Sequence, residues 1–171
     1  MAKKTLGYGL ISVGWMGRVH SRGLSQVPER YPELGVAIRK VIAADTLESA
    51  RDNAVNLMGF EQATENYLDV INHPDVDIVS ICSPNFLHHE IAMAAIKEGK
   101  DFWIEKPMGR SEVESREIAE GAIAKGLMTA VGFNYRQSPA IAHARELVRG
   151  GKLGKIYNVE VKMIADYVND P

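Results

Sequence analysis

A glycine-rich turn near the N-terminus has residue types that bind the phosphates of a dinucleotide. The stretch SVGWMG from Ser12 to Gly17 follows an apolar run and enters a helical pattern, so it matches the G-x-G-x-x-G fingerprint with Ser12 at the first glycine position. Gly14 would let a pyrophosphate approach the backbone, and Gly17 would let a helix pack closely on a strand. If the turn requires a positive φ at Ser12, the serine costs on the order of 1 kcal/mol. A plain tight turn is the alternative interpretation.

Asp45 has the residue type and the position of an acid that accepts hydrogen bonds from a ribose. It ends the second predicted strand, farther from the fingerprint than the usual spacing of about 20 residues. The segment 28–35 reads as an enlarged loop that explains the excess. Thr46, Leu47 and Glu48 follow and offer no Arg or Lys to a 2′-phosphate, which favours NAD over NADP. The alternative is that Asp45 only opens the next helix.

Polar turns also follow the later strands. One is SPNFLH over residues 83–88, another is Glu105-Lys106-Pro107, and a third is NYR over residues 134–136. Lys106 could donate a hydrogen bond to a substrate hydroxyl or assist its proton transfer. The alternative for the Glu105 and Lys106 pair is a solvated surface salt bridge. That every predicted strand ends in a polar or glycine-rich turn is stronger evidence for a ligand site than any one of these motifs.

These turns require a sheet whose strands all end at one edge. Short apolar runs alternate with longer amphipathic segments, which is typical of an α/β protein with a doubly wound parallel sheet and helices on both faces. Ligands of such sheets bind outside the carboxyl ends of the strands. The expected strands are 8–12, 40–44, 76–82, 101–105 and 129–133, and the expected helices are 16–27, 47–58, 87–98, 112–125 and 140–149. A short strand near Ala63, a short helix over 67–72 and a capping box from Ser111 to Glu114 complete the prediction.

The last segment has a different pattern. From Tyr157 to Met163 apolar and polar residues alternate, which predicts an antiparallel strand that is wet on one face. A lone strand cannot bury its apolar face, so it would pair with another chain or begin a second sheet. We therefore expect a dinucleotide-binding domain over residues 1–137, followed over 138–171 by a connecting helix and the start of a truncated second domain.

Composition excludes several classes of function. Lys and Arg number 20 against 22 Asp and Glu, so the chain has no excess of positive charge that would attract nucleic acid or anionic lipid. No run of eighteen apolar residues is present that could span a membrane. Cys82 is the single cysteine, which indicates a reducing, cytoplasmic location and a small core residue rather than a nucleophile. His88 and His89 are adjacent and point apart, so we expect no metal. The remaining histidines read as surface or helix residues: His20, His73 and His143.

Taken together in this order, the motifs resemble the N-terminal half of the Gfo/Idh/MocA oxidoreductase family. The stretches that carry the resemblance are GWMGRVH (14–20), VDIVSICSPNFLH (76–88), EKP (105–107) and GFNYR (132–136). The resemblance implies a Rossmann fold and a catalytic Lys106 near the nicotinamide and the substrate. Together with the motifs above, it gives these candidate cofactor-binding residues: Ser12, Gly14, Trp15, Met16, Gly17, Asp45, Ser83, Pro84, Asn85, His88, Glu105, Lys106, Asn134 and Arg136.

The family resemblance also implies a reaction. It is hydride transfer between NAD and a hydroxyl group of a sugar, an inositol or a related polyol, in a full-length protein that forms a homo-oligomer. A second domain in that family supplies an Asp and a His for substrate binding and proton transfer, so we expect these 171 residues to bind NAD and turn over nothing.

Two alternatives remain open at the level of sequence. One is a regulator or sensor of the same fold that binds NAD without chemistry, against which Lys106 argues. The other is a different Rossmann dehydrogenase, such as a reductase of amino-acid biosynthesis. The combination of S-P-N-x-x-H with E-K-P speaks against that reading.

Overall fold

The computed structural model describes residues 4–162 and residue 164, and it divides the chain into two units that meet between Gly132 and Phe133. The second unit contains η3 (Asn134–Gln137) and α6 (Pro139–Arg149). The elements of the first unit are β1 (Lys4–Ile11), α1 (Trp15–Arg30), η1 (Pro32–Leu34), β2 (Val36–Ala44), α2 (Glu48–Asn56), β3 (Gln62–Thr64), α3 (Tyr67–Asn72), β4 (Ile78–Ile81), η2 (Asn85–Leu87), α4 (His88–Lys97), β5 (Asp101–Ile104), α5 (Glu112–Ala124) and β6 (Thr129–Val131).

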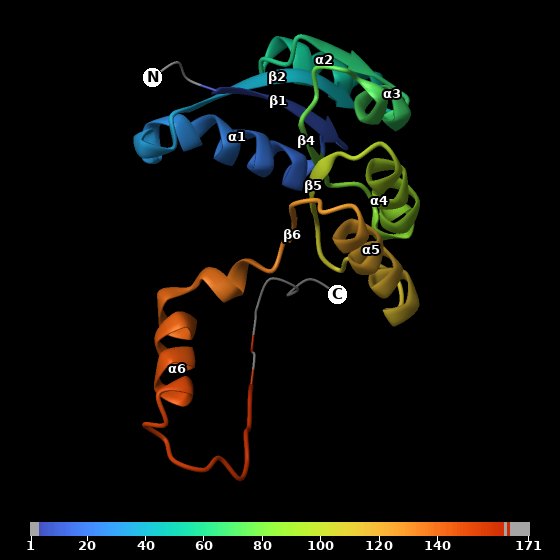
Figure 1. Cartoon of the computed structure of the whole chain (residues 1–171). Helices are drawn as coiled ribbons and strands as arrows, with labels where there is room; N and C mark the ends of the chain where they lie inside the picture. The colour runs from blue at the N-terminus through green and yellow to red at the C-terminus, as the bar shows by residue number, and fades with distance from the viewer. Residues whose placement is uncertain (1–3, 163, 165–171) are drawn as a thin grey trace. The chain divides into compact units, whose positions relative to one another are not determined.

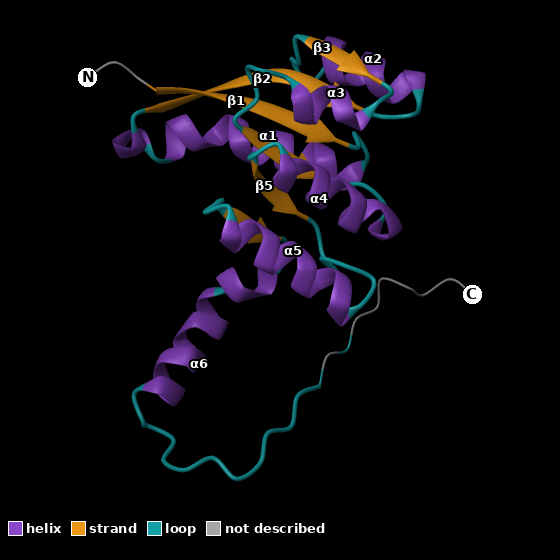
Figure 2. Ribbon diagram, turned by 45° about the vertical axis from the view of Figure 1, so that its right-hand side comes forward, coloured by secondary structure: helices purple, strands orange, loops and turns teal. Residues whose placement is uncertain are grey.

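The first unit is built on one parallel sheet of six strands, with the order β3-β2-β1-β4-β5-β6 and helices around it (Figure 1). This order is that of the Rossmann fold, and it reverses direction between β1 and β4. Crossover connections between parallel strands are right-handed, so α1 and α2 cover one face of the sheet while α3, α4 and α5 cover the other. In agreement, α4 packs against α3 and α5, as Figure 2 shows for α4 and α5.

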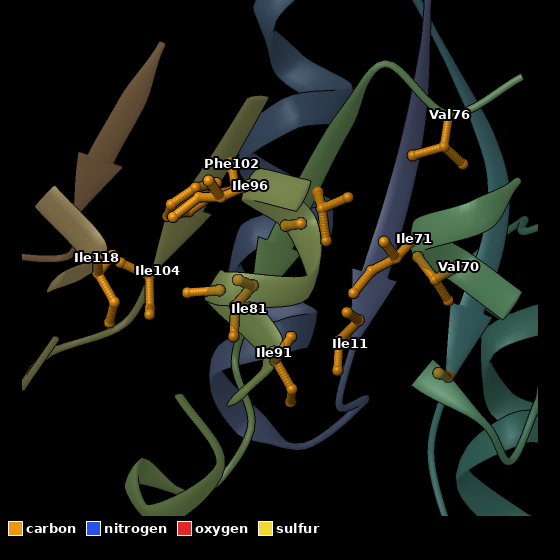
Figure 3. Close-up of a cluster of buried hydrophobic side chains, with 14 of the residues drawn as sticks. Ile11, Val70, Ile71, Val76, Ile81, Ile91, Ile96, Phe102, Ile104 and Ile118 are labelled. Carbon is orange, nitrogen blue, oxygen red and sulfur yellow. The ribbon is translucent and has the colours of Figure 1, made fainter. Parts of the chain in front are cut away.

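Alternation along the strands fills both faces of the sheet. Tyr8 and Leu10 of β1 belong to one cluster of buried side chains, together with Ala54 of α2. Ile11 belongs to the other cluster, with Ile91 of α4, and Figure 3 shows both residues in that cluster. Successive strand residues point to opposite faces, so one short apolar run serves two cores. This is why the predicted strands read as continuous apolar runs.

The predicted fold class is confirmed, and the differences lie in the bounds of the elements. β1 begins at Lys4 and β2 at Val36, because the two strands pair from Lys4 opposite Val36, although their first residues are exposed or only half-buried. Helix α1 continues through Pro28 to Arg30 rather than ending at Val27. The weakly signalled strand near Ala63 and the helix over 67–72 are both present, as β3 and α3.

The capping box at the start of α5 is formed in part as predicted. The Ser111 side chain accepts a hydrogen bond from the Glu114 amide, at 3.2 Å. The Glu114 carboxylate accepts from the amide of Arg110, one residue before the cap, and not from that of Ser111. Both hydrogen bonds of a capping box are therefore present, but the Glu114 carboxylate accepts from the residue before the N-cap and not from the N-cap itself.

The predicted strand over 157–163 is wrong for residues 157–162, which have no regular structure and are exposed, and Met163 lies outside the described residues. The alternating pattern creates an apolar edge, but a strand also needs a hydrogen-bonding partner. Within the described part of the chain no segment pairs with it. The beginning of a second domain at this point, and the predicted boundary at residue 137, remain predictions.

Among the helices that the structure describes, none is both long enough and apolar enough to cross a membrane.

Candidate functional site

The turns that follow the strands lie along one edge of the sheet and are tied to the neighbouring strands. Ser12 donates its amide hydrogen to Ala44 at the end of β2, at 2.8 Å. Each later turn repeats this bond to the last residue of the strand beside it: Cys82 to Ile11 at 2.9 Å, Glu105 to Ile81 at 3.0 Å and Gly132 to Ile104 at 3.0 Å. The edge therefore holds the predicted site residues of the first unit on one continuous hydrogen-bonded frame.

The glycine-rich turn has the backbone geometry that the fingerprint requires. Ser12 has φ 74°, so the first position of the motif does need the left-handed conformation that glycine adopts more easily. A Cβ at Gly17 would lie 2.1 Å from the carbonyl oxygen of Ser12, so only glycine lets α1 pack this closely on the turn. At Gly14 a Cβ would meet only the Ser12 hydroxyl, at 3.8 Å, which leaves open space beside the backbone.

Helix α1 presents an uncapped N-terminus at this open space. Gly14 is its N-cap and no side chain caps the helix. The first turn carries no acidic residue, so its partial positive charge is not neutralised from within. Trp15 is largely exposed and Met16 is half-buried beside it. Such a helix end, preceded by a glycine without steric neighbours, suits an anionic group such as a pyrophosphate.

Asp45 ties the end of β2 to the glycine-rich turn. Its Oδ2 accepts a hydrogen bond from the Val13 amide at 2.8 Å, and its Oδ1 accepts from the Leu47 amide at 3.0 Å. Asp45 is not the N-cap of α2, which begins at Glu48 after Leu47, so the alternative of a simple helix opener is wrong. Each carboxylate oxygen has two lone pairs. The fixed carboxylate therefore keeps acceptor capacity for ribose hydroxyls.

The expectation that no Arg or Lys lies near Asp45 is wrong. Nη1 of Arg51 donates to the carbonyl oxygens of Asp45 and Thr46, at 2.9 and 3.0 Å. Thr46, Leu47 and Glu48 offer no such group, but Arg51 is the fourth residue of α2, and one helical turn brings its side chain back to the loop backbone. The guanidinium group is engaged with this loop backbone, so the carboxylate of Asp45 remains the anionic feature of the loop.

The S-P-N-x-x-H turn is joined to the E-K-P turn by His88. The imidazole is buried, with Nε2 at 2.9 Å from the Ser83 carbonyl oxygen and Nδ1 at 2.8 Å from that of Pro107. Asn85 also donates to the Pro107 carbonyl oxygen, at 2.7 Å. Both ring nitrogens of His88 are engaged inside the protein, so it would act on a cofactor through the turns that it holds. Pro84 is exposed at the same turn.

The Ser83 hydroxyl is a buried polar group at this edge for which the structure gives no partner among the described residues. A buried hydroxyl without a hydrogen bond costs about 1 to 3 kcal/mol, so it is an acceptor and donor available to a bound molecule.

Glu105 and Lys106 occupy different environments although they are adjacent. Glu105 is buried and its carboxylate lies 3.0 Å from Nε2 of His20. Lys106 is exposed at the sheet edge, and its amide hydrogen points to Glu105 Oε2 at 3.3 Å. The alternative of a surface salt bridge between the two is therefore wrong, because the glutamate is paired in the interior. Lys106 is left exposed in the turn that follows β5.

His20 is the residue that sequence reasoning missed. The prediction of a helix residue is confirmed, since His20 lies on α1, but the alternative of a surface position is wrong because the side chain is buried. It follows Gly17 by one helical turn, and that spacing was the available signal that it faces the same turn as the glycine. Cys82 lies 3.4 Å from its Nδ1. Burial, and next the charge of Glu105, raise the pKa of the Cys82 thiol, which agrees with its expected role as a packing residue.

Asn134 and Arg136 belong to the second unit. Both are exposed on η3, which packs against α6. Their assignment to the cofactor site remains a prediction.

A surface pocket of about 410 Å³ lies between α1, β2 and the end of α2. Arg18, Arg22 and Lys40 line it together with hydroxyl and amide side chains. Lys40 donates to the Met58 carbonyl oxygen at 2.7 Å, and partial burial lowers the pKa of its amine. No sequence motif predicts this pocket.

Among the described residues, no three His, Cys, Asp or Glu side chains gather as a metal site would require.

A family model described as an oxidoreductase family with an NAD-binding Rossmann fold, Gfo/Idh/MocA, matches residues 6–133. The chain belongs to this family. The match covers every turn of the first unit discussed above, and it confirms the resemblance predicted from the motifs.

Similar proteins of this family are sugar and inositol dehydrogenases. Levoglucosan dehydrogenase of Pseudarthrobacter phenanthrenivorans is 36% identical over 169 residues, which cover 98% of this chain and 43% of the relative. The NAD(+)-dependent scyllo-inositol 2-dehydrogenase of Bacillus subtilis is 28% identical over 147 residues, 85% of this chain and 41% of the relative. The chain thus spans about two fifths of the length of these curated relatives.

Solved structures of the family agree with the fold. Levoglucosan dehydrogenase in complex with NADH and levoglucosan superposes with a TM-score of 0.82 at 33% identity, covering 89% of this chain and 41% of that one. The scyllo-inositol dehydrogenase of Lactobacillus casei with NAD(H) and scyllo-inositol gives a TM-score of 0.76 at 25% identity, covering 88% and 43%.

Proposed function

We propose that these 171 residues are the NAD-binding portion of a dehydrogenase that acts on a hydroxyl group of a sugar, an inositol or a related polyol. The observation that carries the proposal is the common edge where the Gly14 turn, Asp45 and Lys106 follow neighbouring strands. Similar proteins include levoglucosan and inositol dehydrogenases, one of them solved with NADH and levoglucosan, which supports this substrate class and cofactor.

In this proposal each part of the edge has a separate task. The open backbone at Gly14 and the N-terminus of α1 would hold the pyrophosphate, together with Trp15, Met16 and Gly17. Asp45 would accept hydrogen bonds from the adenosine ribose, for which its oxygens retain lone pairs. The turn of Ser83, Pro84 and Asn85, held by His88, would line the cleft, and the unpartnered Ser83 hydroxyl suits a ligand there.

Lys106 would act at the reacting end of the site. NAD when bound supplies the hydride acceptor or donor, and the protein supplies the proton chemistry of the hydroxyl group. An exposed amine at the strand end can donate a hydrogen bond to that hydroxyl and assist its proton transfer. The buried Glu105 below it holds the turn rather than the substrate. Asn134 and Arg136 are proposed as cofactor contacts on the resemblance alone.

The proposal extends to the cellular setting and assembly. We place the protein in the cytoplasm because a single cysteine in 171 residues suits a reducing compartment. In the full-length protein we expect a homo-oligomer with a small-molecule substrate and neither nucleic acid nor membrane as a partner. The near-neutral charge balance supports the absence of those two partners.

Calorimetric titration of the chain with NAD and NADP tests the cofactor assignment. We expect NAD to bind more tightly, because the Asp45 carboxylate repels a 2′-phosphate and accepts from a 2′-hydroxyl. The Asp45→Asn variant should lose about tenfold or more in NAD affinity, since a hydrogen bond to a charged group contributes about 1.5 to 3 kcal/mol.

Asp77→Asn is the matched control for that titration. Asp77 accepts a hydrogen bond from the Gly7 amide at 2.7 Å, as Asp45 does from the Val13 amide, but next to the start of β4 and away from the site. Its variant should leave NAD affinity unchanged. Tighter binding of NADP than of NAD, or equal losses in the two variants, would contradict the assignment of Asp45.

A further inference from the structure

A buried ionisable pair lies at the sheet edge, and its histidine has no task in the function proposed above. His20 of α1 and Glu105 after β5 meet with Nε2 and Oε1 3.0 Å apart, and their side chains are only 6% and 9% exposed. The two residues are 85 positions apart in sequence. The pair therefore connects the helix of the glycine-rich turn to the turn that carries Lys106.

The imidazole of His20 is fixed on its other sides. Its Nδ1 lies 3.2 Å from the Ser80 hydroxyl and 3.4 Å from the Cys82 sulfur. The ring also packs on Trp103, with 4.9 Å between the ring centroids. These contacts leave the ring one orientation, in which Nε2 faces the carboxylate.

The Glu105 carboxylate also lies close to the backbone of two turns, at Lys106 and at Gly132. Its Oε2 lies 3.3 Å from the amide nitrogen of Lys106. A Cβ at Gly132, after β6, would lie 2.3 Å from its Oε1, so the carboxylate occupies space that only glycine leaves free. One carboxylate thus joins α1, the Lys106 backbone and the end of β6.

Electrostatics determine what this arrangement can do. A buried carboxylate that loses its partner is strongly destabilising, whereas an apolar pair of similar volume stabilises a fold as well as an ion pair does. Packing alone therefore does not require these two residue types here. What this hydrogen-bonded pair adds is a carboxylate oxygen fixed at the amide of Lys106.

We propose that His20 is a positioning residue for Lys106. Through Glu105 it fixes the backbone from which the Lys106 amine reaches the cofactor and the substrate. This inference rests on the proposed function of the site. It assigns to His20 no contact with NAD or substrate, so the single His20 variants below should keep most of their NAD affinity.

Protection of Lys106 from acetylation measures this positioning. The chain is treated with acetic anhydride with and without NAD, and each lysine is quantified by mass spectrometry, with exposed Lys97 and Lys125 as internal references. The NAD concentration is set to ten times the dissociation constant measured for each variant. In the wild type, labelling of Lys106 should slow about tenfold, the factor by which the unbound fraction falls.

Three variants separate positioning from folding. His20→Leu removes the partner of Glu105, and His20→Gln keeps an N–H donor in place of Nε2. The double variant His20→Leu with Glu105→Met replaces the pair by apolar side chains, which should restore any stability that the single variant loses. At matched saturation we expect protection below about twofold in His20→Leu and in the double variant, and near the wild-type value in His20→Gln.

His89→Leu is the matched control. It also removes a histidine that pairs with a glutamate, Glu117 at 2.6 Å, but on the surface between α4 and α5. Full protection in the double variant, or an equal loss in His89→Leu, would overturn the positioning role. Failure of the proposed function gives a different result, because then wild-type Lys106 is not protected or NAD does not bind.

Discussion

Ser12 shows how one residue can depart from a motif while its backbone keeps the motif's geometry. Its φ of 74° is the conformation for which glycine is normally selected at this position. The amide of Ser12 nevertheless bonds to Ala44, and the turn reaches Asp45 through Val13. The surrounding hydrogen bonds therefore hold the serine in a conformation that it would not choose alone.

Ser12→Gly should stabilise the chain. The left-handed conformation costs a non-glycine residue about 1 to 2 kcal/mol, and the added freedom of glycine in the unfolded chain returns up to about 1 kcal/mol of this. We expect a net gain on the order of 0.5 to 1 kcal/mol in the free energy of unfolding, measured by urea denaturation. Ser12→Ala, which keeps the strain, should show no gain. A less stable Ser12→Gly variant would contradict strain at this residue.

Helix α1 is the element on which the site depends most. It carries the N-terminus proposed for the pyrophosphate, and it also carries His20 on its inner face. Its distance from the sheet is set at Gly17, which touches the backbone of Ser12. A change at this one contact should therefore disturb both the phosphate end and the Lys106 end of the site.

Two glycines of the same helix offer a direct comparison. Gly17→Ala would place a Cβ 2.1 Å from the Ser12 carbonyl oxygen, so we expect a loss of about 1 to 3 kcal/mol in stability and weaker NAD binding. Gly23→Ala meets no atom within 4 Å and should gain about 0.5 to 1 kcal/mol from helix propensity. Thermal denaturation and NAD titration of both variants measure this. Equal changes in the two would show that α1 does not pack on the turn as described.

At the scale of the whole chain, cofactor binding and turnover are separable. The edge of the first unit contains the groups proposed for NAD, whereas the chain spans about two fifths of its curated relatives. The family resemblance assigns a further Asp and His of the reaction to a domain beyond the first unit. Binding and chemistry should therefore be tested in separate experiments.

NAD should stabilise the chain against unfolding. A ligand that binds only the folded state adds about 2.7 kcal/mol at 100 times its dissociation constant, which raises the melting temperature by several degrees. Differential scanning calorimetry over a series of NAD concentrations measures the shift, and adenine alone serves as the control. A melting temperature independent of NAD concentration would contradict binding to the folded chain.

Turnover by these 171 residues alone should be absent. We expect no NADH formation above background with a panel of sugars and inositols that includes levoglucosan and scyllo-inositol, followed by absorbance. Lys106 by itself offers one of the groups that the reaction needs. Robust turnover by this chain would show that the first unit suffices for catalysis.

The sequence alone determined the α/β class, the parallel sheet, the glycine-rich turn and the family, because apolar periodicity and strand-end motifs are local patterns. It also located Asp45 and Lys106, since each directly follows a recognisable strand. It could not decide which groups each side chain contacts. The His20 contact with the Glu105 carboxylate, and those of His88 and Arg51 with the carbonyl oxygens of Pro107 and Asp45, depend on how helices return to the sheet.

Tertiary structure also decided where an alternating sequence pattern does not form the strand that it predicts. Residues 157–162 alternate as a strand does, yet they form none, because a strand is stabilised by a neighbour's hydrogen bonds and not by its own sequence. The same reason separates Glu105 from Lys106. Both are charged residues of one turn, but only the fold places an imidazole below Glu105 and so buries that residue while Lys106 stays at the edge.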